Sequence, residues 1–252
     1  MFDLMVSADT VMLSALIFAA ALLYSSVGHA GASGYIAAMA LFGTAPAVMK
    51  PTALVLNILV AALGTWRWHR ARLVNWPALM PLLLLSIPCA FAGGAIQLPV
   101  TWYRLVIGAI LIVAAATFLI KPDQGPIADR SAAAVPVAGG LVSGGTVGFL
   151  SGLTGTGGGI FLSPILLLMR WATPRQASGI TAPFILFNSI AGLMGNLAAL
   201  RSLPTELPVL ATAALAGGLI GTTIGTRWAS STLLQRLLGI VLLIAGIKFI
   251  WL

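Results

Sequence analysis

The stretch FLSGLTGTGGGIFLSPILLL, residues 149–168, decides the fold. Its centre, Thr154 to Gly159, reads T-G-T-G-G-G, and hydrocarbon side chains flank it on both sides. Glycine adopts backbone conformations that are closed to other residues, so this run predicts a break in a membrane helix. We expect a helix to restart at Ile160, with Ser163 and Pro164 near its start, where proline is tolerated. A helix that begins at membrane depth directs free N–H groups and a positive dipole end at the break, which favours an anion.

Composition places the whole chain in a membrane. Of its 252 residues, 60% are hydrophobic and only 7% are charged, which leaves no room for a soluble domain. The apolar runs are continuous and about twenty residues long, as membrane helices require, and do not alternate as the strands of a β-barrel would. We expect the first run to be a membrane span and not a cleaved signal, because no A-x-A-like site follows it. The net charge of +8 comes from cations in short loops and is not a nucleic-acid footprint.

Ten apolar segments follow one another along the chain. They cover residues 11–27, 34–43, 51–68, 78–97, 102–120, 134–153, 159–170, 178–200, 207–226 and 232–251. Two of them, 34–43 and 159–170, are short, and each follows a glycine cluster. The polar residues 121–133 predict a linker between repeat 1, about 10–120, and repeat 2, about 134–252, within a single transporter domain, 1–252. The sequence therefore predicts an all-α polytopic membrane protein with two homologous halves of about five segments each.

Two offsets align the halves. A shift of 131 residues superposes Asn57 on Asn188, and a shift of 125 superposes GYIA, which begins at Gly34, on GIFL, which begins at Gly159. Internal repeats of this kind are typical of transporters. If each half crosses the membrane an odd number of times, the two halves are inverted relative to each other.

The cations distinguish two topologies. If all ten segments cross and the N-terminus is outside, nine lysines and arginines lie inside and four outside. If the two short segments are re-entrant and the N-terminus is inside, the count is seven against six. The positive-inside rule prefers ten crossings. Ten residues of helix cover only about 15 Å, half of the hydrocarbon core, so whether the short segments cross or are re-entrant stays open.

The first half has a glycine cluster of its own, GHAGASGY, from Gly28 to Tyr35. Together the two clusters predict one site for a small anion, formed by two helix N-termini near the midplane. The alternative is that the glycines only allow close helix packing, as we expect for two other glycine ridges, Gly140, Gly144, Gly148 and Gly152, and Gly217, Gly221 and Gly225. The predicted substrate-binding residues are His29, Ala30, Ser33, Gly34, Asn57, Thr154, Gly155, Thr156, Gly157, Gly158 and Asn188.

Three polar side chains in or near the clusters allow two interpretations each. His29 binds an anion or carries a proton, or else it is a neutral histidine bonded to a backbone carbonyl. Asn57 and Asn188 contact the substrate or cap a break, or else they form plain helix-to-helix hydrogen bonds. No acidic residue falls in an apolar segment, whereas proton- and cation-coupled carriers usually keep a carboxylate there. With one interior histidine and the single Cys89, we expect no metal and no other cofactor.

Two glycine-rich breaks in a duplicated chain of this length resemble the TauE/SafE family of sulfite and organosulfonate exporters over essentially the whole chain. The stretch from Thr154 to Pro164, TGTGGGIFLSP, is the most specific part, and GHAGASGY is more degenerate than family members often show. The resemblance implies transport of a small anion, such as sulfite, sulfoacetate or another organosulfonate, by a multi-pass protein of the bacterial inner membrane. The residues themselves indicate an anion; its sulfur comes from the resemblance alone.

We therefore expect an exporter that works by alternating access. Its predicted partners are a small anionic substrate and the lipid bilayer, with no nucleic acid, and its oligomeric state stays open. The alternatives are a channel-like or structural membrane protein and a carrier of a small carboxylate. A membrane-embedded enzyme is disfavoured, because the interior offers too few residues for a metal site or a nucleophile.

Overall fold

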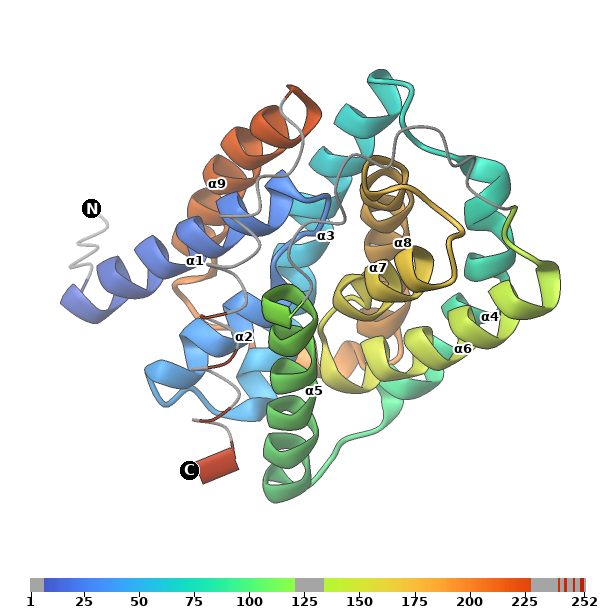
Figure 1. Ribbon diagram of the computed structural model, residues 1–252. Helices are drawn as coiled ribbons and strands as arrows, with labels where there is room; N and C mark the ends of the chain where they lie inside the picture. Colours follow the sequence, from blue (N-terminus) through green and yellow to red (C-terminus); the bar gives the residue numbers. More distant parts are fainter. Residues whose placement is uncertain are drawn as a thin grey trace.

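A computed structural model describes residues 7–120 and 134–227, together with residues 240, 243, 247, 250 and 251. Within these residues every regular element is a helix (Figure 1). The elements are α1 (Ala8–Ser26), α2 (Ala32–Leu41), α3 (Pro46–Arg70), α4 (Trp76–Ala95), α5 (Val100–Ile120), α6 (Val137–Thr154), α7 (Gly159–Leu168), α8 (Pro174–Met194), the 3-10 helix η1 (Leu197–Ser202) and α9 (Leu207–Arg227). The predicted linker at 121–133 and most of the tenth segment lie outside the described residues.

Six of the described helices are long and apolar enough to cross a bilayer: α1, α3, α4, α6, α8 and α9. The short helices α2 and α7 have ten residues each. The chain is therefore an all-α polytopic membrane protein, and both predicted short helices are present.

Several helix boundaries differ from those expected. α2 begins at Ala32, two residues before the predicted segment, because Gly31 reverses the chain with a φ of +110° and so allows the helix to start at once. α8 begins at Pro174, because Thr173 and Gln176 form a capping box there. Pro164 lies inside α7 and not near its start, so the Ile160 carbonyl loses its helical partner.

The long helices pack in pairs. α1 lies against α9 and α4 against α6, and α3 and α8 lie between the two pairs and touch each other (Figure 1). The two glycine ridges are the contact surfaces, as expected: a Cβ on Gly144 would lie 2.1 Å from the carbonyl oxygen of Leu82, and one on Gly221 would lie 2.2 Å from that of Leu22. Backbones approach this closely only where side chains are absent.

Hydrogen bonds between helix ends fix the directions of the long helices. Arg67, near the end of α3, donates to the carbonyl oxygen of Leu219 at 2.7 Å, and Arg175, at the start of α8, donates to that of Thr226 at 3.3 Å. At the opposite end, the Ser202 hydroxyl donates to the carbonyl oxygen of Ala47 at 3.0 Å. The end of α3 and the start of α8 therefore lie together beside the end of α9, and α3 and α8 are antiparallel.

Candidate functional site

The first break lies between α1 and α2. Gly28 and Gly31 both have positive φ angles, +79° and +110°, so the chain reverses over five residues between the two helices. The backbone amide of His29 still donates to the carbonyl oxygen of Tyr24 at 2.9 Å, which closes the end of α1. α2 then starts at a fully buried position.

The second break lies between α6 and α7. Gly155, Gly157 and Gly158 all have φ angles between +75° and +81°, which other residues rarely adopt. The Gly155 amide donates to the carbonyl oxygen of Ser151 at 2.8 Å and so ends α6. Both glycine clusters therefore form the helix breaks that the sequence predicts.

A narrow cavity among buried residues joins the two breaks. Its lining residues come from both glycine clusters and from their two neighbouring helices: Tyr24, His29, Ala30, Gly31, Ala32, Ser33, Thr156, Gly159, Ile160 and Ile185. Its free space is about that of one water molecule, far below the roughly 300–1,000 Å³ of sites for drug-sized ligands. No acidic side chain lines the cavity.

Backbone amides at the starts of both short helices lack protein partners. Within the described residues, the amides of Ser33 and Gly34 at the start of α2 have no acceptor, and neither do those of Gly159 and Ile160 at the start of α7. All four residues are buried. Free donors at a helix N-terminus favour negative charge, and here two such termini meet at one cavity.

His29 connects the first break to the second. Its Nε2 lies 3.0 Å from the carbonyl oxygen of Gly159 and 3.1 Å from the hydroxyl of Ser163, and its Nδ1 lies 3.2 Å from the carbonyl oxygen of Val27. The Ser163 hydroxyl also bonds to that of Thr181 at 3.0 Å. A neutral ring either donates from Nδ1 to Val27 and accepts at Nε2 from Ser163, or donates from Nε2 to Gly159, whereas a charged ring donates to both carbonyl oxygens.

Asn57 holds both breaks from the middle of α3. Its side-chain oxygen accepts from the amide of Ala32 at 3.0 Å, and its side-chain nitrogen donates to the carbonyl oxygen of Thr156 at 3.4 Å and to the hydroxyl of Ser189 at 3.3 Å. Asn57 therefore caps the breaks, and its bond to Ser189 also joins α3 to α8.

Comparisons with known proteins decide the family. The model of the sulfite exporter TauE/SafE family matches residues 13–249. The chain belongs to this family. It is also 41% identical over 241 residues to "Probable membrane transporter protein y4hK" of Sinorhizobium fredii, which covers 93% of this chain and 95% of that protein. A second relative, "Probable membrane transporter protein MJ0441" of Methanocaldococcus jannaschii, is 27% identical over 151 residues, or 59% of this chain and 55% of that protein. No solved structure matches.

TauE/SafE membership and the six apolar helices make the chain a multi-pass membrane transporter, and the bacterial inner membrane fits the family. The recognition made from the glycine clusters is confirmed.

Asn188 lies differently from its counterpart. In this TauE/SafE chain its side-chain nitrogen donates to the hydroxyl of Ser86 on α4 at 3.1 Å and to the carbonyl oxygen of Phe184 at 2.8 Å. Its side-chain oxygen is buried and has no partner within the described residues. The contact with α4 is the helix-to-helix bond of the second interpretation, and Asn188 does not line the cavity.

The other predicted residues divide into those that line the cavity and those that shape it. His29, Ala30, Ser33 and Thr156 line it. The rest lie behind it. Gly34 packs against Ala20 and Tyr24; Thr154 bonds to Thr156 at 2.9 Å; Gly155 packs against Lys50; Gly157 against Asn57; and Gly158 against Phe184.

Several cavity residues were not among the predicted site residues. Gly31, Ala32 and Gly159 belong to the two glycine clusters, so the clusters themselves pointed to them. Tyr24, whose hydroxyl accepts a 2.7 Å bond from Ser33, lies one turn before the first cluster. Ile185 comes from α8 and carries no signal in the sequence, because only the packing of α8 brings it there.

Proposed function

We propose that this transporter exports a small anion, most favourably sulfite or an organosulfonate, and binds it between the two breaks. The observation that carries the proposal is the set of free amides at the starts of α2 and α7, which meet at one small cavity without a carboxylate. A sulfite or sulfonate offers oxygens that accept from several amides at once, and its charge complements two positive dipole ends. The expectation that the anion contains sulfur rests on the family name.

We further propose that the two halves are repeats related by a pseudo-two-fold axis in the membrane plane. The packing supports this, because exchanging the halves maps the α1–α9 pair onto α6–α4, and the α2–α3 pair onto α7–α8. The turns that end the short helices also correspond. The amide of Thr44 donates to the carbonyl oxygen of Met39, and that of Trp171 to that of Leu166, 127 residues later in each case. The short helices therefore correspond at 127 residues and not at the 125 that superposes GYIA on GIFL.

The hydrogen bonds of Arg67 and Arg175 to α9 support ten crossings. With re-entrant short segments, Arg67 would lie inside and Arg175 outside. Both bond near the same end of α9, which requires one side for both. Ten crossings place them together on the inside, with α2 and α7 meeting head to head between the two faces. Alternating access then follows if one break opens to one face of the membrane and the other break opens to the other face, one at a time.

The direct test is ligand binding by the purified transporter. A ligand that binds only the folded state raises its stability, by about 2.7 kcal/mol at a hundred times Kd. Sulfite, sulfoacetate and methanesulfonate should raise the melting temperature, taurine and acetate less, and sodium or potassium chloride not at all. Saturable uptake into liposomes separates a carrier from a channel. Stabilisation by acetate alone would favour a carboxylate carrier, and stabilisation by none of these anions would contradict the proposal.

A further inference from the structure

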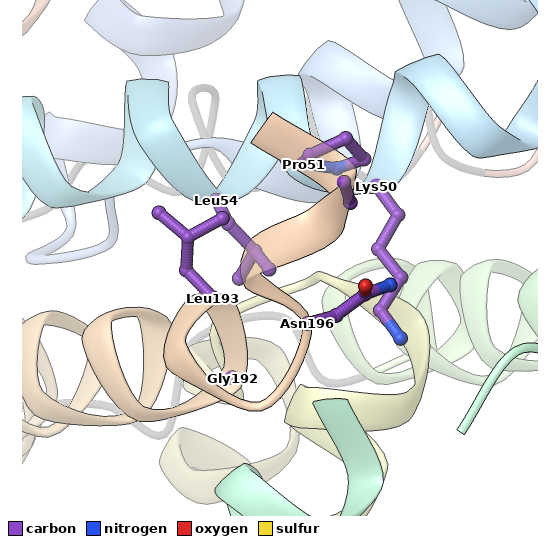
Figure 2. Close-up of a pocket in the computed structure, with 7 residues that line it drawn as sticks. Lys50, Pro51, Leu54, Gly192, Leu193 and Asn196 are labelled. Carbon is purple, nitrogen blue, oxygen red and sulfur yellow. The ribbon is translucent and has the colours of Figure 1, made fainter. Parts of the chain in front are cut away.

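A second cavity lies away from the first, where the start of α3 meets the end of α8 (Figure 2). It encloses about 170 Å³ of empty space, a figure that includes space open to solvent, and it shares no lining residue with the cavity between the breaks. Its lining residues are Lys50, Pro51, Leu54, Gly192, Leu193, Asn196 and Ala199. Under the ten-crossing arrangement, this end of α3 faces the outside.

Lys50 is the charged group of this cavity, and it is only 9% exposed. Its ammonium donates to the carbonyl oxygens of Gly94 and Ile96, both at 3.1 Å, at the end of α4. Neither of the acidic residues that the structure describes, Asp9 and Glu206, bonds to it. A buried charge is expensive, and in membrane proteins such a residue often marks a functional site. Two of the three N–H donors of the ammonium are used, which leaves one for a ligand.

Asn196 supplies a second polar group. Its side chain lies on the same side of the cavity as the Lys50 side chain in Figure 2, and no hydrogen bond of its side-chain amide is found within the described residues. An ammonium and a free amide at one cavity can both donate to an anionic oxygen.

The second break lies directly behind Lys50. A Cβ on Gly155 would lie 3.0 Å from Cγ of Lys50, so the lysine stem packs on the glycine. The first break has a comparable contact, Gly28 against Ser178 of α8, and there a serine is enough. Packing on the break therefore does not explain why the residue at this position is a cation.

We propose that the Lys50 cavity is a second site for a small oxyanion, held by the Lys50 ammonium and the Asn196 amide. This role rests on the proposed function. An exported sulfonate would bind at this second site after it leaves the second break and before it reaches the outer face. The competing explanation is that Lys50 only caps the end of α4. A lysine that only caps carries the same charge but does not hold an anion, so competition by an unreactive anion separates the two explanations.

The test labels a cysteine in this cavity with reagents of opposite charge. In a Cys89→Ser background, Ala199→Cys, which lines the cavity and leaves Lys50 and Asn196 in place, is reacted with a sulfonate-bearing and a trimethylammonium-bearing methanethiosulfonate, and the ratio of the two rates is measured. A unit charge at about 4 Å is worth about fivefold even in bulk water, so Lys50→Met should lower the sulfonate-to-ammonium ratio at least about fivefold. Lys50→Arg should keep it. Any change in the thiolate fraction affects both reagents equally and cancels in the ratio.

Two controls complete the experiment. Leu197→Cys, exposed on η1 and outside the cavity, should give a ratio that is less sensitive to Lys50→Met. Methanesulfonate should slow the labelling of Ala199→Cys while Lys50 and Asn196 are present, and this arm does not depend on whether Lys50→Met folds. An unchanged ratio in folded Lys50→Met, or no slowing by methanesulfonate, would overturn the second site. The labelling needs no transport, so a charge-selective cavity in a protein that carries no anion would contradict only the proposed function.

Discussion

The side-chain oxygen of Asn57 accepts a 3.0 Å hydrogen bond from the backbone amide of Ala32, the first residue of α2. The same side chain donates to the carbonyl oxygen of Thr156 in the other half of the chain. One amide in α3 therefore sets the start of one short helix and the position of the opposite break. The free amides of Ser33 and Gly34 follow directly after the capped one, so Asn57 also determines where these donors lie.

Asn57→Ala should therefore damage binding as well as stability. Leaving a buried polar group without its partner costs about 1–3 kcal/mol, and the loss of an N-cap costs about 0.5–2 kcal/mol. Asn188→Ala is the matched control, because it removes an equally buried amide that bonds to α4 and not to a break. We expect both variants to lower the melting temperature, and Asn57→Ala to weaken the anion-dependent thermal shift far more. Equal effects on that shift would contradict the role of Asn57.

Alanine variants of Gly157 and Gly43 distinguish the effect of backbone strain from that of a steric clash. Their φ angles are nearly equal, +75° and +70°. A Cβ on Gly157 would lie 2.3 Å from the side-chain nitrogen of Asn57, whereas a Cβ on Gly43 meets nothing within 4 Å. Each alanine variant should cost about 1–2 kcal/mol through the left-handed backbone. Only Gly157→Ala should also abolish anion transport into liposomes, and normal transport by folded Gly157→Ala would show that this break is structural.

Much of this arrangement is visible in the sequence. The glycine clusters predicted both breaks, because runs of glycine do not form a helical packing ridge, and the spaced glycines at Gly144 and Gly221 predicted the helix contacts. The partners of Asn57 and Asn188 were not predictable. The two asparagines correspond in sequence, yet one faces the amide of Ala32 and the other the hydroxyl of Ser86. The burial of Lys50 was likewise not predictable from the sequence, because it depends on where α4 ends.

Two arginines test the topology, because the competing arrangements place them on opposite sides. Ten crossings put Arg175 inside and Arg201 outside, and re-entrant short segments reverse both. Both residues are exposed, so cysteines there remain reachable. In a Cys89→Ser background, a membrane-impermeant thiol reagent added to intact cells should label Arg201→Cys and spare Arg175→Cys until the membrane is opened. The opposite labelling would contradict the ten-crossing arrangement and therefore also the inverted repeat.

The lack of a carboxylate at the cavity between the breaks bears on what drives transport. No acidic side chain lines the cavity between the breaks, so we expect export without sodium, driven by the membrane potential and the substrate gradient. One negative charge that leaves an inside-negative cell gains about 2.3 kcal/mol per 100 mV, which supports a gradient of about fiftyfold. His29 is the one side chain at this cavity that could carry a proton instead.

The most direct measurement is uptake of radiolabelled sulfite or sulfoacetate into liposomes that contain the purified transporter. A potassium-diffusion potential is set with sodium absent and with equal pH on both sides. An interior made positive should drive saturable anion entry, and an interior made negative should suppress it. Uptake that ignores the potential, or that appears only with a sodium or proton gradient, would contradict the account.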